Sequence, residues 1–410
     1  MNILWLSHLV PYPPKGGVLQ RSFNLIKEVS KSHNVSLLAF NQKALLPSED
    51  DLKQAVGELE KICRSVKVVP IPSEEKSYGK AALYVKSLFT AAPYTINWLR
   101  SGEMEHQIEE ILTKRKIDMV HFDTISLAPY YSLAEGYKKI LNHHNIESDM
   151  MIRRGGQEKN PIKKVYLLQE GYKILRYENR VCESFDLNLT CSLLDSERLL
   201  RRIPRLRVEE IPNGVDLKYF YPLNQIREEH SLVFAGGMKW YPNRSAMLFF
   251  VNNIWPLLKK EVPDVKMTVI GREPPPEVVN LARMDGHFKV TGFVDDVRPY
   301  IDKAMVYVCP IRDGGGTRLK ILDALAMGKP IVAHPVAVEG IDVEPEKQVL
   351  IAETPSEFVR QIARLFGDSI LYRRLSEEGR RLVMEKYDFE KIGEKLSRVY
   401  REMSEDRVPS

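Results

Sequence analysis

Short apolar runs alternate with amphipathic stretches along the chain. Ile3–Leu6, Val35–Phe40 and Val66–Ile71 are rich in aliphatic and β-branched residues, which is typical of strands buried in a parallel sheet. Between the first two runs, apolar residues recur at helical spacing in Phe23–Val29. The order of strand, turn, helix and strand predicts a βαβ unit, and therefore an α/β fold with doubly wound parallel sheets.

The same pattern begins again in the second half of the chain. Strands are predicted at Leu232–Ala235 and Val265–Ile270, with a helix from about Asn243 to Leu258 between them. Before them lies Ile211–Asp216, reading IPNGVD, in which a proline and an Asn-Gly turn end one structural unit and allow a bend. Because 410 residues exceed what one hydrophobic core usually organises, we expect two domains joined at this segment.

The composition, with 44% hydrophobic and 28% charged residues, is typical of a soluble globular protein. The net charge is +5, and residues 1–214, with 31 basic and 26 acidic side chains, account for all of it. A modest excess confined to one half favours an anionic acceptor or a membrane surface over nucleic acid, and no nucleic-acid-binding motif accompanies it. The alternative is an ordinary solvated surface.

Cysteine usage and the start of the chain indicate a compartment. The four cysteines lack metal-ligand spacing and are predicted to be reduced thiols. The first predicted strand starts at Asn2, without the basic and apolar segments of a signal peptide. No apolar stretch approaches the roughly 18 residues of a membrane span. We therefore expect a cytoplasmic protein.

The most informative stretch is Cys309–Gly340, which reads CPIRDGGGTRLKILDALAMGKPIVAHPVAVEG. A strand ends there, three glycines form a loop, and a helix follows for which Thr317 is the expected N-cap. Arg318 and Lys320 then lie in the first helical turn, where the helix dipole disfavours cations unless an anion is bound. In the alternative, both cations point into solvent and Lys320 pairs with Asp323.

Together these features resemble the C-terminal domain of GT-B glycosyltransferases, specifically the retaining family 4 type and its branch that carries GGGTRLK. The IPNGVD string resembles the segment at that family's interdomain hinge. The resemblance implies a GT-B fold of two Rossmann-like, doubly wound parallel-sheet domains facing across a cleft. It implies an acceptor-binding domain over 1–210, a donor-binding domain over 211–385, and a C-terminal helix over 386–410 that crosses back to the first domain.

The resemblance also implies a donor site in the second domain. Loop amides and cations would hold the diphosphate, a carboxylate one turn later would take the ribose hydroxyls, and a second acidic residue would lie near the donor sugar. The residues at these places are Gly315, Gly316, Thr317, Arg318, Lys320, Asp323 and Glu339. The family's usual pair of glutamates, eight residues apart, is replaced by Gly315 and Asp323. After the Gly236-Gly237 turn beside the phosphates, Met238 stands where the family often has an arginine, and Arg244 stands at the place of its lysine.

In the first domain, the resemblance places Gly16 and Gly17, in the first strand-to-helix loop, beside the donor phosphates. His121 and Asp123 end one predicted strand, and His144 follows the next. Ligands bind at the carboxyl ends of parallel strands, so these side chains are candidates for the cleft. In the family a histidine after such a strand contacts the donor sugar. His121 matches its local motif best, with Asp123 and His144 as alternatives.

The implied reaction moves a sugar, with retained configuration, from a nucleoside diphosphate sugar to a glycan, lipid-linked or polysaccharide-precursor acceptor of the cell envelope. Because the chain contains no Asp-x-Asp, and cations would stabilise the leaving diphosphate, we expect neither a metal nor a cofactor. The residues expected to act at the reacting atoms are His121, Asp123, Arg318 and Lys320. The alternatives are a nucleotide-sugar epimerase on the same fold, and a scaffold without catalysis, which Gly315 and Met238 suggest.

Three basic stretches of the first domain are candidates for acceptor or membrane contact. They are Tyr78–Trp98, which mixes aromatic residues with lysines, residues 151–181, and Arg198–Arg207. Core packing is the alternative for the first stretch, and a solvated face is the alternative for the other two. Peripheral contact with the inner membrane face through the N-terminal domain is therefore a second expectation, beside the cytoplasmic location.

Overall fold

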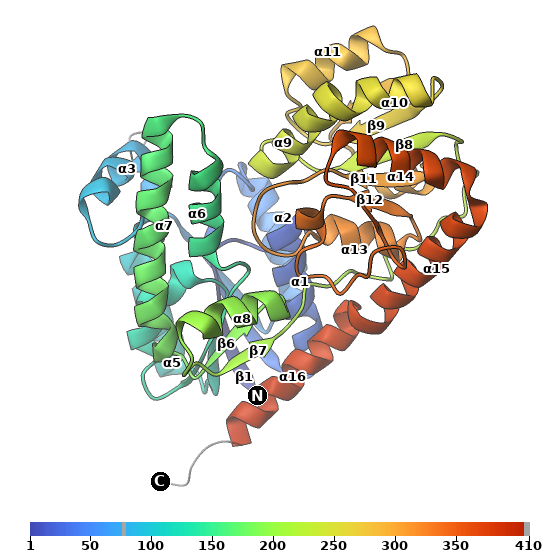
Figure 1. The fold of residues 1–410 in the computed structure, drawn as a ribbon. Helices are drawn as coiled ribbons and strands as arrows, with labels where there is room; N and C mark the ends of the chain where they lie inside the picture. Colours follow the sequence, from blue (N-terminus) through green and yellow to red (C-terminus); the bar gives the residue numbers. More distant parts are fainter. Residues whose placement is uncertain (76–78, 406–410) are drawn as a thin grey trace. The chain divides into compact units, whose positions relative to one another are not determined.

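The computed structural model describes residues 1–75 and 79–405, and the chain divides into two compact units. Unit 1 comprises Met1–Pro212 with the chain from Phe389 onward, and unit 2 comprises Asn213–Asp388. Each unit is a parallel β-sheet flanked by helices, so the predicted α/β fold with two parallel sheets is confirmed (Figure 1). Tyr78, at the start of the stretch that mixes aromatic residues with lysines, lies outside the described residues.

The sheet of unit 1 has seven parallel strands in the order β3-β2-β1-β4-β5-β6-β7. The two central strands, β1 and β4, are buried along their whole length apart from the first residue of β1. Their apolar side chains alternate between two hydrophobic cores, one on each face of the sheet. The strands are β1 Asn2–Ser7, β2 Asn34–Asn41, β3 Ser65–Pro70, β4 Met119–Phe122, β5 Lys138–Asn142, β6 Leu187–Thr190 and β7 Val208–Glu210.

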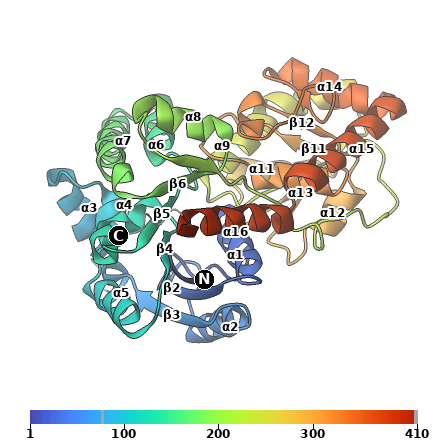
Figure 2. The ribbon, with the colours of Figure 1, turned by 90° about the horizontal axis from the view of Figure 1, so that it is seen from below.

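Helices cover both faces of this sheet, and the last helix of the chain is one of them. The α16 helix lies along α1, where a Cβ added to Gly393 would collide with the side chain of Glu28 (Figure 2). Glycine at this position therefore permits the close approach of the two helices. The helices of unit 1 are α1 Gly17–Val29, α2 Glu49–Glu60, α3 Gly79–Phe89, α4 Tyr94–Trp98, α5 Gly102–Lys114, α6 Glu147–Gln157, α7 Pro161–Val181, α8 Leu193–Arg202 and α16 Phe389–Glu405.

The sheet of unit 2 has six parallel strands in the order β10-β9-β8-β11-β12-β13. They are β8 Ser231–Ala235, β9 Lys266–Ile270, β10 Phe288–Gly292, β11 Val306–Cys309, β12 Ile331–Ala333 and β13 Leu350–Ile351. The helices are α9 Tyr241–Phe249, α10 Trp255–Glu261, α11 Pro276–Met284, α12 Arg298–Lys303, α13 Leu319–Ala326, α14 Pro355–Gly367 and α15 Ser369–Lys386. A single π-helical turn, Phe250–Ile254, joins α9 to α10, so the one helix predicted between these strands is locally widened.

The start of α13 differs from the prediction. The N-cap residue is Arg318, and its side chain makes no capping hydrogen bond, whereas the hydroxyl of Thr317 is buried without a hydrogen-bond partner among the described residues. Gly314 and Gly316 both have positive φ, at 107° and 67°, and this turn moves the helix start one residue later. The expected capping role of Thr317 is therefore wrong.

The segment predicted to join the domains is held to unit 1 at its beginning. The buried guanidinium of Arg21, on α1, donates hydrogen bonds to the backbone oxygens of Ile211, at 2.8 Å, and Pro212, at 2.9 Å. Charge-assisted bonds to buried carbonyl oxygens are stronger than neutral ones, so they fix the end of the unit firmly. Within the described part of the chain, every helix is too short or too polar to cross a lipid bilayer.

Candidate donor site and histidine cluster

Two strand-to-helix connections of unit 2 meet beside Lys320. One is the Gly236-Gly237 turn between β8 and α9, and the other is the glycine loop between β11 and α13. Lys320 Nζ donates a hydrogen bond of 2.5 Å to Asn243 Oδ1, and Asn243 Nδ2 donates one of 2.8 Å to the backbone oxygen of Gly237. A Cβ added to Gly236 would collide with Lys320 Nζ. A side chain at this position would therefore push the Lys320 ammonium and the Asn243 amide aside.

Lys320 is a largely buried cation, and its Nζ lies 4.4 Å from the centre of the Phe234 ring. Burial lowers the pKa of Lys320 to about 8, although Cys309 and Asp323 oppose the shift. Arg318 is buried as well, with 3% of its surface exposed. The alternative in which both cations point into solvent is therefore wrong. A cation that is shielded from water and has a lowered pKa is strongly stabilised by a nearby anion.

Arg318 supports the glycine loop from inside. Its guanidinium donates hydrogen bonds to the backbone oxygens of Gly315 and Gly316, and another of 3.2 Å to that of Asp313. It also lies 5.7 Å from the centre of the Trp240 ring, just before α9. In this geometry Arg318 shapes the loop, and its contact with a phosphate stays a prediction.

The other residues predicted to bind the donor differ in how deeply they are buried. Arg244 is exposed on the first turn of α9, and Asp323 is half-buried on α13. Burial raises the pKa of the Tyr307 phenol, and the nearby carboxylate of Asp323 adds to this rise. Glu339 is half-buried directly after the 3₁₀ turn Pro335–Val338. Met238, in the place of the family's arginine, is a core residue with 1% exposure, so the backbone turns this position inward.

Gly16 and Gly17 stand at the start of α1 in unit 1. Gly16 has φ 122° and ψ 157°, a conformation that a residue with a Cβ adopts only under strain. It is the N-cap residue, and its backbone oxygen accepts the hydrogen bond of Gln20 N at 2.8 Å. The first-turn amides of an α-helix have no partner within the helix, and the phosphate beside this loop stays a prediction.

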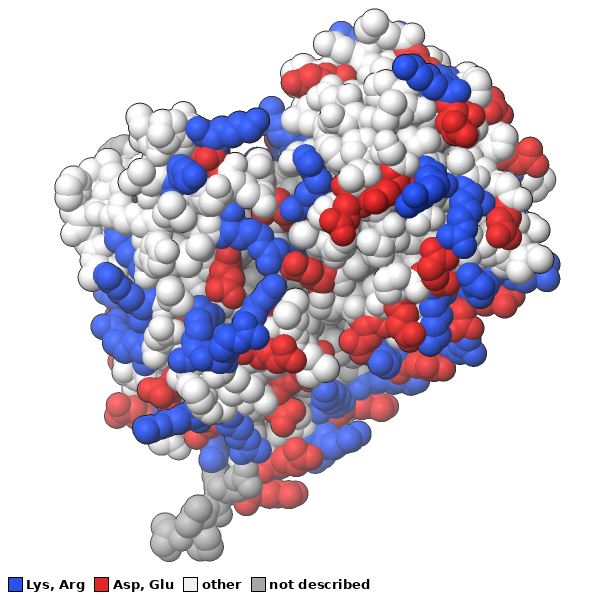
Figure 3. Space-filling model, viewed as in Figure 1, with Lys and Arg blue, Asp and Glu red and all other residues white. Residues whose placement is uncertain are grey.

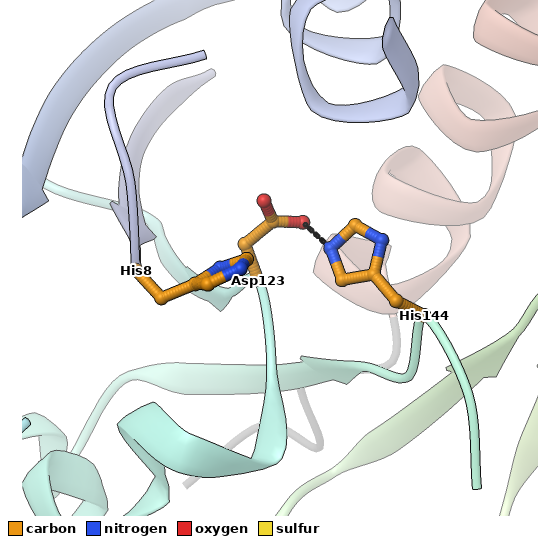
Figure 4. Close-up of side chains that lie close together, drawn as sticks. All are labelled: His8, Asp123 and His144. Carbon is orange, nitrogen blue, oxygen red and sulfur yellow. Dashed lines mark ion pairs between the residues drawn. The ribbon is translucent and has the colours of Figure 1, made fainter. Parts of the chain in front are cut away.

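A buried carboxylate and two histidines lie together at the carboxyl edge of the unit 1 sheet. His8 follows β1, Asp123 follows β4 and His144 follows β5, and these three strands are neighbours. One ligand atom from each side chain lies within 4.8 Å of the other two, and His144 Nε2 lies 3.2 Å from Asp123 Oδ1 (Figure 4). His8 is half-buried, whereas Asp123 and His144 are buried.

A hydrogen-bond network fixes the carboxylate of Asp123. Ser22 Oγ donates to Oδ2 at 2.6 Å, and Asn142 Nδ2 donates to Oδ1 at 2.8 Å. Arg21 in turn donates to Asn142 Oδ1 at 3.2 Å. Burial opposes ionisation of Asp123, but the neighbouring rings of His144 and His121 hold its pKa well below the usual range. The site therefore contains a buried negative charge.

His121 occupies a different place from the one predicted for it. Its ring is fully buried, stacks on Trp5 with ring centres 3.7 Å apart, and shares a hydrogen bond of 2.8 Å between Nδ1 and the Tyr400 hydroxyl. Burial lowers the pKa of His121, so the ring is neutral at neutral pH. Direct contact with a sugar would require Trp5 or Tyr400 to move. Of the two candidate histidines, His144 is the one that lies in a cluster with Asp123 and His8.

The residues that sequence reasoning missed are His8 and the groups that hold Asp123, and one signal could have found His8. It lies one residue after the first strand, in the same position relative to its strand as Asp123. His143, in contrast, points elsewhere: its Nε2 lies 3.0 Å from Asn188 Oδ1, and burial lowers its pKa to about 4. Glu147, which begins α6, has its pKa raised to about 7 by burial.

The two parallel-sheet units define the class of protein. This architecture is the GT-B fold, and sucrose-phosphate synthase (tll1590) from Thermosynechococcus elongatus shares it, with a TM-score of 0.70, 16% identity, and 98% of this chain and 99% of that chain covered. Anabaena Alr3699/HepE in complex with UDP shares it too, with a TM-score of 0.67, 14% identity, and 98% and 100% covered.

The second unit then gives the enzyme class. Residues 229–368 match the family described as Glycosyl transferases group 1, and with this domain on a GT-B fold the chain is a glycosyltransferase. The chain is also similar to an uncharacterised 44.6 kDa protein in the cps region of Klebsiella pneumoniae, with 21% identity over 403 residues that cover 95% of this chain and 97% of the relative.

Proposed function

We propose that this protein transfers a sugar, with retained anomeric configuration, from a nucleoside diphosphate sugar to a glycan, lipid-linked or polysaccharide-precursor acceptor. The observation that carries the proposal is the junction in unit 2 where Lys320, Asn243 and the Gly236-Gly237 turn meet beside the glycine loop. Backbone amides, a helix start and a dry cation in one place form a site for a diphosphate.

The chemistry follows from charge. As the glycosidic bond breaks, negative charge grows on the leaving diphosphate, and a cation in a dry environment stabilises that charge more strongly than one in water. Lys320 is such a cation, with Arg244 exposed nearby on α9 and with loop amides that Arg318 supports. Asp323 would orient the ribose and Glu339 the donor sugar. These groups supply the stabilisation without a metal ion on the diphosphate.

The comparisons suggest which nucleotide to test first. Alr3699/HepE, a protein with this fold, is known in complex with UDP. Uridine diphosphate is therefore the first candidate, and the base itself would be held by packing and backbone groups.

The experiment is a thermal melt of the full chain against UDP, GDP, ADP, TDP and CMP. A ligand at about a hundred times its Kd adds about 2.7 kcal/mol of stability, which is easily seen. We expect one diphosphate to stand out and CMP to give no shift. Turnover of the matching nucleotide sugar with an acceptor then identifies a transferase, whereas sugar isomers formed without an acceptor would identify an epimerase. Binding without turnover on any acceptor panel, or no binding, would support the scaffold alternative.

We also propose that unit 1 meets its acceptor at an anionic membrane surface. Helix α3 and the first turns of α7 expose large apolar side chains, with Phe89 at 86%, Ile162 at 83% and Val165 at 65%. Lysines 86, 163 and 164 lie among them and are exposed. Figure 3 shows further basic side chains over α6, α7 and α8. Apolar side chains interleaved with lysines suit the headgroup region of an anionic bilayer.

The two helices form one surface, because the Tyr84 and Tyr166 rings lie 4.7 Å apart and Lys173 Nζ donates to the Ser87 backbone oxygen at 2.6 Å. Sedimentation with vesicles containing phosphatidylglycerol should carry the wild-type protein down, and vesicles of phosphatidylcholine alone should not. A double change of Phe89 and Ile162 to serine should abolish the effect. Equal sedimentation of this variant would exclude the surface.

A further inference from the structure

The His8, Asp123 and His144 side chains converge from three neighbouring strand ends (Figure 4). The sheet order places β1, β4 and β5 side by side, so the residues that follow these strands meet at one edge. Each residue directs a nitrogen or carboxylate oxygen inward, and the three atoms lie within 4.8 Å of one another. The cluster lies wholly within unit 1 and does not involve the candidate diphosphate site of unit 2.

The chemistry of these three groups is that of a metal site. Two imidazoles and one carboxylate form a set that binds zinc and related divalent transition metals, with a further position left open. With bonds of about 2.0–2.2 Å, ligand atoms around a tetrahedral ion lie about 3.3–3.6 Å apart. The separation of 3.2 Å between His144 Nε2 and Asp123 Oδ1 is close to that value. The remaining separations are at most 4.8 Å, so His8 would close on the ion by an inward movement of its side chain.

Two buried nitrogens in the cluster also lack hydrogen bonds. His8 Nδ1 and His144 Nε2 are both inaccessible, and neither makes a hydrogen bond of acceptable geometry within the described residues. His144 as a whole is more than nine-tenths buried. Buried polar atoms are rarely left unsatisfied in folded proteins. A cation between these nitrogens and the buried carboxylate would satisfy all three groups.

The surroundings are also those of a metal ligand set. Ser22 and Asn142 donate to the two oxygens of Asp123, and Arg21 orients Asn142. Outer groups of this kind fix ligand orientation in metal sites. Ser22 donates to Oδ2, and Oδ1 is the oxygen that lies beside His144 Nε2.

We propose that His8, Asp123 and His144 bind one divalent transition-metal ion of the zinc class, in a three-ligand site with an open position for water. The proposal replaces, for unit 1, the sequence-based expectation that the chain has no metal site. If the proposed function also holds, an ion here occupies Asp123 and His144, two of the groups predicted to face the donor sugar, and should therefore inhibit transfer. The binding itself does not depend on that function.

The test is calorimetric titration of the chelator-treated full chain with Zn²⁺, and with Mg²⁺ as a probe that requires oxygen ligands. We expect one Zn²⁺ per chain and no Mg²⁺ binding. His8→Ala should weaken Zn²⁺ binding at least tenfold, and so should Asp123→Asn. His106→Ala, which removes an exposed histidine of α5, is the matched control and should change nothing.

His8→Ala is the decisive variant because His8 is only half-buried, so its replacement should not disturb the fold. The melting temperature of metal-free His8→Ala should therefore match that of the metal-free wild type. Zn²⁺ binding that survives in His8→Ala at wild-type affinity, or that falls in His106→Ala instead, would show adventitious surface binding and overturn the proposal. Absence of Zn²⁺ binding by the wild type would overturn it as well. Inhibition of transfer by Zn²⁺ that is lost in His8→Ala would then connect the site to activity. A wild-type chain that binds Zn²⁺ in the titration but transfers no sugar in its metal-free form would contradict the proposed function alone.

Discussion

Replacement of Lys320 by methionine should stabilise the apo protein and weaken nucleotide binding. Burial lowers the pKa of Lys320 from 10.5 to about 8. Lowering the pKa by about 2.5, at about 1.4 kcal/mol for each pKa unit, means that holding the charged form in the folded state costs about 3.5 kcal/mol at neutral pH. Methionine keeps the chain length beside the Phe234 ring, but it leaves Asn243 Oδ1 without its donor, which costs about 1 kcal/mol. The expected net gain in the free energy of unfolding is about 2.5 kcal/mol.

The pH dependence of folding stability independently tests whether the Lys320 charge destabilises the folded state. Because the pKa of Lys320 is lower in the folded state than in the unfolded state, the unfolded chain binds more protons between pH 8 and 10.5. The cost is fully present below pH 8 and fades as the pH rises through this window. Wild-type stability should therefore rise relative to Lys320→Met over the same range. Urea unfolding at pH 7, 8.5 and 10 measures both effects.

Nucleotide affinity should be lower in Lys320→Met, although the apo protein is more stable. A charge-assisted hydrogen bond contributes about 1.5–3 kcal/mol, so the loss of Lys320 should weaken the diphosphate identified in the melt by about 10- to 100-fold. Lys239→Met is the matched control, because that side chain is 79% exposed and pairs with Glu273 at 3.8 Å. It should leave apo stability and affinity nearly unchanged. An Lys320→Met protein that is less stable at pH 7, with unchanged affinity, would refute the buried-cation argument.

Two further substitutions probe the same unit. Asp323→Asn should weaken a ribonucleotide more than its 2′-deoxy analogue, measured by calorimetry, and equal losses would remove Asp323 from the ribose. Gly236→Ala should reduce nucleotide affinity at least tenfold, because the new methyl group displaces Lys320 Nζ and the Asn243 amide, whereas a Cβ at Gly237 meets nothing within 4 Å and Gly237→Ala should bind as the wild type does. Equal affinities of the two alanine variants would contradict the proposed close approach.

Much of the fold was predictable because buried parallel strands have a strong apolar pattern. The runs Ile3–Leu6 and Val35–Phe40 correspond to β1 and β2, extended by one residue or so at each end. The start of α13 was not predictable in the same way. Thr317 has the side chain of a good N-cap, but the positive φ of Gly316 sets the backbone, and the guanidinium of Arg318 bonds back to the loop. A long-range contact thus overrode a local preference.

The electrostatics of the candidate donor site also depend on long-range contacts, which the sequence does not show. The sequence predicted that Lys320 would be unusual for its place in a helix, but not that it would be buried. Its partner Asn243 belongs to another helix and carries no signal in the sequence, since an asparagine in a first helical turn is ordinary. Likewise, His121 has the better local motif, yet it is Trp5 and Tyr400, from opposite ends of the chain, that enclose its ring.

Sheet order explains why one member of the histidine cluster was overlooked and two were not. β4 and β5 follow each other in the sequence, so the sequence alone relates their strand-end residues to one another. β1 lies more than a hundred residues earlier, yet it is the other neighbour of β4 in the sheet. In a doubly wound sheet the first strand is central, because later strands are added on both sides of it. A polar residue after the first strand is therefore as strong a candidate as one after its neighbours, and His8 meets this condition.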